Sequence, residues 1–576
     1  MKPFPFLYLL LLSSVLAQAE ARLDNKQSAT DNEIELSKPD AKLRPETTTE
    51  RPESNIEDAT KHNKAIAGSN EFNSKLFAGF TDEHLHGAAY LIDQAIGKLL
   101  GVVPANEKGT RSEFAKYALK DTSNDDLVHA TTQELIAEAG FKCETHYVEA
   151  DDGYITQLIR LINPLADRSQ LRRPPVAMFH GGTLDTSIYV AQSTRQHHPE
   201  RWPRVEGEMH TSWNRSLGFV LANNGYDVWL VGSRGCNRAN QGHRRLNKWV
   251  PLLSPRARAS PKWLESNTRE LIKFWSNHTY EDIIEKEIPR QLDRVLHLSG
   301  SNRFSIVALS NSVPITMGLL STRPDIAARV HNYVAIGPIL SEKNSNRAAQ
   351  LVYRTVTQLG DELGIIGFSE VILSQATRDA IQDMIRSPIM RYTLFKLVTN
   401  NAFGPSPKFQ TFIEPNLIAH LLLPFGFKSL KQTCQILIAG KVQRYDYGPI
   451  ENQLRYGSGV PPEYDMSKMR CDNWLVVSHE NDPLSRLEDV QNLINVVPKK
   501  PYKHIFNENA NHLDIVGLAD IDIKINLPVL EFMDTFPDEQ AAPLVDRGPQ
   551  QIAADEQIDR ELEKFVPPDD RGVVRN

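Results

Sequence analysis

The sequence predicts an α/β fold in which a mostly parallel sheet is flanked by helices. Between residues 131 and 536, short apolar strands alternate with segments of helical periodicity. Two of these strands, 175–179 and 226–231, run directly into glycine turns. A third strand, 304–309, leads through a serine into an apolar helical segment at 313–320. The chain has no internal repeat that would indicate a solenoid or a propeller.

The length and charge of the chain narrow its possible functions. Its 576 residues are enough for one large domain with accessory segments. The 65 basic and 72 acidic side chains give a net charge of −7. No basic cluster recurs with interleaved aromatic residues, so nucleic acid is not an expected partner. A small substrate or a soluble partner is favoured.

The first residues have the pattern of a signal peptide, which we predict over 1–19. An apolar stretch at 4–16 is followed by Ala-Gln-Ala at 17–19, the small-x-small form that signal peptidase cleaves. The alternative is a membrane anchor, but the stretch is shorter than the roughly 18 residues that span a bilayer. We therefore expect entry into the secretory pathway, with secretion and lysosomal delivery both open.

Secretory entry would make two sequons and four cysteines meaningful. Asn214 and Asn277 each begin an Asn-x-Ser/Thr sequon and are candidate glycosylation sites. In an oxidising compartment four cysteines could pair in three ways, and buried free thiols are the alternative. These cysteines are Cys143, Cys236, Cys434 and Cys471.

The segments outside the domain differ from it in composition. Residues 20–75 are rich in charged and small polar side chains, which predicts a disordered leader. A helical extension is expected at 76–130, where apolar residues of 88–100 recur at helical spacing. It is expected to pack on the main domain, with a propeptide or a lipid-contacting element as the alternative. Residues 537–576 form a polar tail in which only 551–565 could be helical.

Ser310 is the candidate nucleophile. It stands between the strand 304–309 and the helix 313–320, which is the strand–turn–helix context of a nucleophile elbow. Such elbows favour Gly-x-Ser-x-Gly because side chains at the outer positions would collide with neighbouring backbone. Here those positions hold Ala308 and Ser312. The five-residue motif alone therefore also fits an ordinary strand followed by a helix.

A serine nucleophile needs an imidazole base, and that base needs a carboxylate. In hydrolases with such an elbow the order along the chain is Ser, Asp, His. Asp482 is the predicted acid because it lies in the loop after the strand 474–478. His512 is the predicted base because it follows the last strand, 502–506. Other nearby candidates for the acid are Asp489, Asp514 and Glu480. His504 is the other candidate for the base, but it is predicted within a strand, which favours a structural role.

The third requirement is a pair of backbone N–H groups that bind the oxyanion. Asn311 follows the nucleophile, and Gly182 lies in the early turn His180-Gly181-Gly182. We predict these two residues as the donors, and an ordinary tight loop is the alternative for the turn. This chemistry requires no metal or cofactor.

These segments resemble the acid lipase family, which comprises the gastric and lysosomal acid lipases and their insect and nematode relatives. The resemblance extends over about 131–536 and is most specific at 214–235, where Asn-Arg-Ser-Leu-Gly-Phe precedes Tyr-Asp-Val-Trp and Ser-Arg-Gly. Similar runs lie at 140–155, 274–282, 445–448, 482–490 and 512–514.

The resemblance implies an α/β-hydrolase fold with a helical cap inserted at about 340–465. The implied site residues agree with the choices made above: Ser310, Asp482, His512, Gly182 and Asn311. The cap would shield a lipid acyl chain from water. Residues 417–427 are apolar enough to line it, although ordinary core packing explains the same residues.

The chain departs from the family in three places. Its elbow reads Ala-Leu-Ser-Asn-Ser where the family has Gly-His-Ser-Gln-Gly, Gly182 replaces a leucine, and the polar leader and tail are additional. The side chain of Ser312 is expected to press against the neighbouring strand, with strain of about 1–3 kcal/mol. Such strain would reduce or abolish activity.

We expect a secreted or lumenal lipase that hydrolyses carboxylic esters of lipids, acylglycerols or sterol esters, through an acyl-enzyme on Ser310. Its expected partner is the lipid ester substrate, with transient contact to a lipid surface. A non-catalytic relative that keeps the lipid pocket as a carrier or receptor is the main alternative, because both elbow glycines are replaced. A hydrolase of another bond, such as a thioester or a peptide, is a third hypothesis.

Overall fold

The structure is a computed structural model. It describes residues 125–166, 171–192, 215–237, 240, 242–244, 278–365, 403–406, 415–421, 426–518, 520–538 and 548–566. The predicted signal peptide, the leader, most of the helical extension and both sequon asparagines lie outside these residues.

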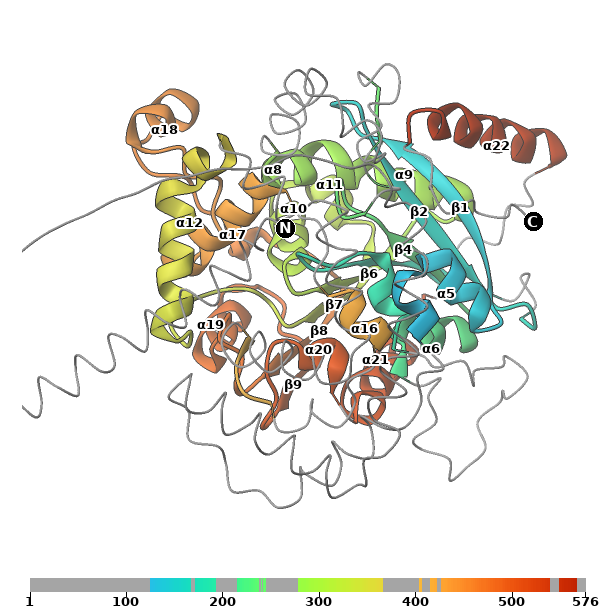
Figure 1. Ribbon diagram of the computed structural model, residues 1–576. Coiled ribbons are helices and arrows are strands. Elements are labelled where there is room, and N and C mark those ends of the chain that lie inside the picture. Colours follow the sequence, from blue (N-terminus) through green and yellow to red (C-terminus); the bar gives the residue numbers. More distant parts are fainter. Residues whose placement is uncertain are drawn as a thin grey trace, which may run out of the picture. The chain divides into compact units, whose positions relative to one another are not determined.

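A nine-stranded sheet runs through the described part of the chain (Figure 1). Its order is β1-β2-β4-β3-β6-β7-β8-β9, with β5 paired to β2. The pairs β1–β2, β2–β4 and β2–β5 are antiparallel, and all others are parallel. The predicted mostly parallel sheet is therefore confirmed. The strands are β1 (Lys142–Glu149), β2 (Tyr154–Ile162), β3 (Arg172–Phe179), β4 (Tyr226–Val231), β5 (Gly242–His243), β6 (Phe304–Leu309), β7 (Val330–Ile336), β8 (Asn473–His479) and β9 (Lys503–Asn507).

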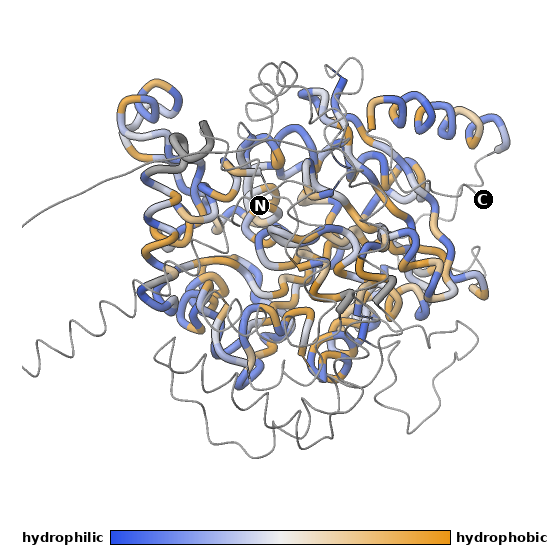
Figure 2. Tube along the Cα trace, in the orientation of Figure 1, coloured by the Kyte–Doolittle hydropathy of each residue, from blue (hydrophilic) through white to orange (hydrophobic). Residues whose placement is uncertain are grey.

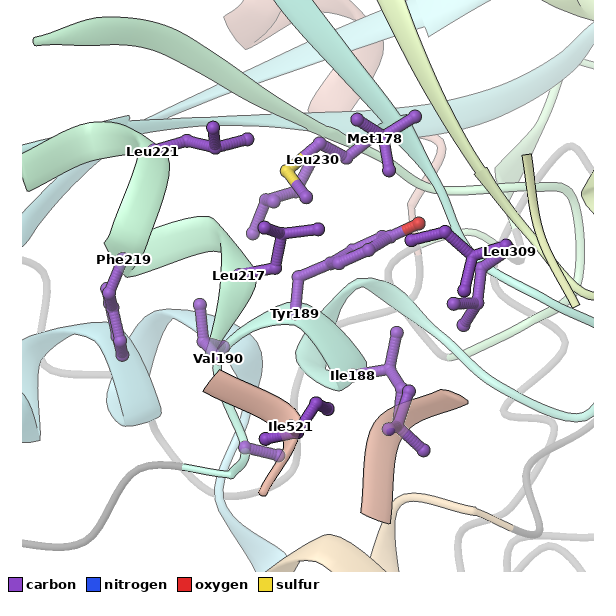
Figure 3. Packing of buried hydrophobic residues seen from close by; sticks show 14 of the residues in the cluster. Met178, Ile188, Tyr189, Val190, Leu217, Phe219, Leu221, Leu230, Leu309 and Ile521 are labelled. Atoms are coloured by element: carbon purple, nitrogen blue, oxygen red, sulfur yellow. The ribbon is translucent and has the colours of Figure 1, made fainter. Parts of the chain in front are cut away.

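Both faces of the central strands are buried, which explains why these strands are continuous apolar runs. Along β3, Val176 and Met178 join one hydrophobic core, while Ala177 and Phe179 join the other. Figure 3 shows part of the first core, in which Tyr189 lies among aliphatic side chains. The Tyr189 hydroxyl donates to the carbonyl oxygen of Phe179 over 2.7 Å. The end of β3 is thereby fixed near the site described below.

Helices cover both faces. Residues in the first core come from α5 (Thr132–Glu138), α6 (Leu217–Asn223), α16 (Pro415–Ala419), α20 (Asp514–Gly517) and α21 (Leu527–Thr535). Residues in the second come from α8 (Tyr280–Asp282), the π-helical η8 (Ile283–Glu287), α9 (Ile288–Ser299), α10 (Ser312–Thr322), α11 (Pro324–Ala327) and α19 (Leu487–Val496). In the described part of the chain, no helix combines the length and the apolar character that a bilayer crossing requires.

The described α-helices between β7 and β8 fall in the predicted cap range, 340–465, and the short 3-10 helix η11 (Met466–Lys468) follows them. Besides α16 they are α12 (Arg347–Ile365), α17 (Phe427–Ala439) and α18 (Pro449–Tyr456), with α12 packed along α17 (Figure 1). Leu417, Ile418 and Ala419 belong to the core on the sheet. For these three residues the alternative of ordinary core packing holds, and lining of the cap stays a prediction.

The polar tail contains the helix α22 (Pro549–Glu563), which is largely hydrophilic in Figure 2. Asp559 of this helix accepts a hydrogen bond from the backbone N–H of Tyr147 in β1 over 2.9 Å. Its other oxygen lies 2.8 Å from Nδ1 of His146. The helix is thereby attached to the strand at the end of the sheet.

All four cysteines are free, so none of the three possible pairings is formed. Burial raises the pKa of Cys143 to about 11 and that of Cys434 and Cys471 to about 12. The Cys236 thiol is buried, and its pKa is also raised by burial. These thiols are therefore protonated and unreactive at neutral pH.

A buried ion pair joins β2 to β4, and removing one partner should be strongly destabilising. Nε of Arg160 lies 2.6 Å from Oδ1 of Asp227, and the two side chains are 4% and 2% exposed. Asp227→Ala would leave a buried guanidinium without its principal partner, so the free energy of unfolding should fall by about 3–5 kcal/mol. Urea denaturation measures this.

The matched control is Asp293→Ala, which removes the exposed pair between Asp293 and Arg329. It should change the free energy of unfolding by less than about 1 kcal/mol. Equal effects of the two variants would contradict the importance assigned to burial.

Candidate active site

Ser310 lies in the turn between β6 and α10. Its φ is 56°, in the left-handed region that side chains other than glycine rarely adopt. Its backbone N–H donates to the carbonyl oxygen of Ile336 at the end of β7 over 2.7 Å. The turn is thereby fixed in the sharp conformation that presents a nucleophile at the end of a strand.

Ser310, His512 and Asp482 form one hydrogen-bonded series. Oγ of Ser310 lies 2.8 Å from Nε2 of His512, and Nδ1 of His512 lies 2.7 Å from Oδ2 of Asp482. The second carboxylate oxygen of Asp482 accepts the backbone N–H of Leu484 over 2.8 Å. The three side chains come from the turn after β6 and the loops after β8 and β9, and all are buried.

The other sequence candidates have different partners. Asp489 pairs with Arg486, Asp514 accepts the N–H of Asn511, Glu480 accepts the N–H of Asn509, and His504 in β9 bonds Ser478. Of the four candidate carboxylates, Asp482 is the one that hydrogen-bonds His512. Within the described ranges, no group of His, Cys, Asp and Glu side chains is arranged to hold a metal ion.

The loop after β3 approaches Ser310 so closely that it needs glycine. A Cβ on Gly181 would lie 2.9 Å from Cβ of Ser310. A Cβ on Gly182 would lie 3.3 Å from Cβ of Asn311. The two predicted oxyanion donors, Gly182 and Asn311, are therefore neighbours beside Ser310.

His180 holds this loop, a role that the sequence did not reveal. Its Nδ1 lies 2.8 Å from the carbonyl oxygen of Gly181, and its Nε2 accepts the N–H of Ser233 over 3.1 Å. Burial lowers the pKa of His180, so the neutral ring donates through Nδ1. This bond orients the peptide whose N–H belongs to Gly182. A histidine directly before two glycines was the available signal.

Phe403 is a second site neighbour that sequence reasoning missed. Its ring stacks on His512 with 6.1 Å between centroids. Its carbonyl oxygen accepts the backbone N–H of His512 over 3.1 Å. One aromatic residue in a long insertion gives no sequence signal of such a contact.

Ser312 fits the elbow through hydrogen bonds, so the expected strain at this position is not found. Its Oγ accepts the N–H of Leu309 over 2.8 Å and lies 2.9 Å from the carbonyl oxygen of Phe179 in β3. The positive φ is at Ser310, not at Ser312. Ala308 is fully buried in the core between β6 and the helices. Both replacements of glycine are thus accommodated.

Ser312→Ala should destabilise the fold by about 1–3 kcal/mol, because it removes the acceptor of a buried N–H group. Chemical denaturation measures the change. Ser321→Ala on the same helix is the control, since its hydroxyl bonds a helical carbonyl and its loss should cost less than about 1 kcal/mol. An unchanged free energy of unfolding in Ser312→Ala would refute the structural role of the hydroxyl.

A buried histidine beside the site links stability to pH. Nδ1 of His479 lies 2.6 Å from the carbonyl oxygen of Asn511, and Nε2 has no hydrogen-bond partner in the described structure. Burial lowers the pKa of His479 to about 4, although Asn511 and the charge of Asp482 act in the opposite direction and His512 adds to the lowering.

The unfolded chain binds a proton at this histidine near pH 6.5, whereas the folded chain does so only near pH 4. The stability contributed by neutral His479 is therefore present above pH 6.5 and lost as the pH falls toward 4, about 3 kcal/mol in all. His479→Asn keeps a donor but cannot be protonated. Its urea midpoint should fall less than that of the wild type between pH 7.5 and 4.5, and an equal fall would contradict the assignment.

The strand order, the helices on both faces and the sharp turn at Ser310 define an α/β-hydrolase fold. A family model described as "Partial alpha/beta-hydrolase lipase region" matches residues 132–193. A solved acetylester hydrolase from Corynebacterium glutamicum aligns with a TM-score of 0.39 and 11% identity, over 72% of this chain and 99% of its own.

The chain is also similar to lipases of the acid lipase type. A gastric triacylglycerol lipase of Bos taurus is 24% identical over 420 residues, 69% of this chain and 90% of its own. Lipase 1 of Drosophila melanogaster is 22% identical over 470 residues, 79% of this chain and 93% of its own. Together with the family model, these relatives support a carboxylic ester hydrolase that acts on lipids.

Proposed function

We propose that the protein is a lipase that hydrolyses carboxylic esters of lipids through an acyl-enzyme on Ser310. The observation that carries this proposal is the hydrogen-bonded series from Oγ of Ser310 through His512 to Asp482. The names of the relatives favour acylglycerols as substrates, and sterol esters fit the same chemistry.

In the proposed reaction, Nε2 of His512 accepts the proton of Ser310 as Oγ attacks the ester carbonyl carbon. Asp482 keeps the other ring nitrogen protonated and stabilises the imidazolium. The backbone N–H groups of Gly182 and Asn311 bind the oxyanion. His512 then donates its proton to the leaving alcohol and activates water, which releases the fatty acid and restores Ser310.

We also propose a secreted or lysosomal location, with glycosylation at Asn214 and Asn277 and transient contact with a lipid surface. The signal-peptide pattern at 1–19 supports secretory entry. A gastric lipase among the relatives supports the same compartment. Peptide mapping of the secreted protein would test both sequons.

A lipid carrier without activity is less well supported. That alternative rested on the two replaced elbow glycines, and the hydrogen bonds of Ser312 make its side chain compatible with the turn. A binding protein also has no chemical need for a carboxylate behind the histidine.

A fluorophosphonate probe should label the purified protein, and Ser310→Ala should abolish labelling, because the probe forms a covalent bond with an activated serine. Intact mass measurement identifies the adduct. Ser478→Ala is the matched control, since Ser478 also bonds a histidine, His504, over 2.7 Å. Ser478→Ala should leave labelling unchanged. A folded wild-type protein that remains unlabelled would contradict the proposed lipase and favour the carrier.

A further inference from the structure

The side chain of Asn311 is held in a way that its proposed backbone role does not explain. The side chain is only 3% exposed. Its Oδ1 accepts a hydrogen bond from the hydroxyl of Tyr280 in α8. Oγ1 of Thr433 in α17 lies 2.7 Å from the Tyr280 hydroxyl and 3.3 Å from Oδ1. The oxygen end of the carboxamide therefore faces two hydroxyl groups.

These two hydroxyls fix which way the amide points. Burial raises the pKa of Tyr280, so its hydroxyl stays protonated and remains a donor. Because its single proton goes to Asn311, its 2.7 Å contact with Thr433 uses the Thr433 proton, for which the carbonyl oxygen of Ser429, 2.9 Å away, is a second acceptor. Hydrogen bonds arranged in series polarise one another, which strengthens the hold on Oδ1.

The nitrogen end of the same amide lies beside the oxyanion loop. A Cβ placed on Gly182 would be 3.5 Å from Nδ2 of Asn311. Among the described residues, Nδ2 has no hydrogen-bond partner. This nitrogen is not one of the fully buried polar atoms that lack a partner, so it reaches the accessible surface of the site and can donate to a ligand there. Its place next to the nucleophile makes a bound ligand the natural acceptor.

Gly182 gives this amide its room. A Cβ at position 182 would press on Cβ of Asn311 at 3.3 Å, and a longer side chain would take the space that the carboxamide fills. The glycine and the asparagine are therefore complementary: the first has no side chain, and the second provides a polar one.

We propose that Nδ2 of Asn311 is a third donor to the carbonyl oxygen of the ester, and that Tyr280 and Thr433 are positioning residues for it. This proposal rests on the proposed lipase activity. As Oγ of Ser310 bonds the carbonyl carbon, the π electrons of the C=O bond move onto oxygen, and Nδ2–H hydrogen-bonds that oxygen without transferring its proton. The bond strengthens with the charge, so it acts mainly in the transition state.

Steady-state hydrolysis of a soluble p-nitrophenyl ester and the rate of fluorophosphonate labelling test this proposal. Asn311→Ala retains the backbone N–H and removes only the side-chain donor, so kcat should fall by about 100 to 1000-fold with KM little changed. Asn311→Asp keeps the shape and the acceptor for Tyr280 but replaces Nδ2 with oxygen. It should lower kcat at least as much, whereas a merely structural role would leave it active.

Tyr280→Phe should lower kcat in the same direction but less, because the amide remains and loses its orientation. The matched control is Tyr333→Phe, which removes another buried tyrosine hydroxyl that bonds a threonine, Thr316, over 2.9 Å. The control should retain wild-type kcat. Thermal unfolding of each variant identifies any that fails to fold. The folded substitutions at Asn311 then decide whether its side chain acts as a donor.

The outcomes separate the two proposals. If folded wild-type protein neither hydrolyses the ester nor reacts with the probe, both proposals are overturned. If the wild type is active and folded Asn311→Ala and Asn311→Asp keep kcat within about threefold, the lipase stands and the third donor is overturned. Loss of activity in Tyr333→Phe equal to that in Tyr280→Phe would likewise overturn the positioning role.

Discussion

The parallel register of β6, β7, β8 and β9 is the constraint on which the site depends. Leu309, Ile336, Val477 and Ile505 lie in register across these four strands, so the loops at their carboxyl ends meet at one edge of the sheet. A slip of one residue would turn each side chain to the opposite face, because the side-chain period of a strand is two. Two separate hydrophobic cores oppose such a slip. The sheet thereby brings together Ser310, Asp482 and His512, which follow one another in the chain at separations of 172 and 30 residues.

The sequence predicted those parts of the molecule whose signals are local. The strands 304–309 and 226–231 coincide with β6 and β4 because each is a short, continuous apolar run next to a turn. The candidates for nucleophile, acid and base followed from strand ends and chain order, and the structure brings them within hydrogen-bonding distance. The role of the apolar segment at 417–427 was harder to predict, since hydrophobicity alone does not distinguish a cavity wall from a core.

What the sequence did not reveal depends on contacts between distant segments. Ser312 was expected to strain the turn, because the sequence could not show that its hydroxyl would bond Phe179, which lies 133 positions away. His180 and Phe403 act through individual hydrogen bonds and ring contacts that leave no periodic pattern. The same holds for Tyr280 and Thr433, which come from either side of Asn311 in the sequence and meet only in the folded chain. Polar contacts of this kind are seen only in the folded structure and cannot be predicted from the sequence.

The attachment of α22 to β1 has a consequence for the edge of the sheet. An outer strand with free N–H groups is a template on which another polypeptide can pair, and such pairing leads to aggregation. At Tyr147 the acceptor is Asp559 of the polar tail, not a neighbouring molecule. The tail, which is additional to the family resemblance, thus gives the molecule a polar boundary at one side of its sheet. A segment that takes no part in the candidate site thus occupies a position on the outer strand where another polypeptide could pair.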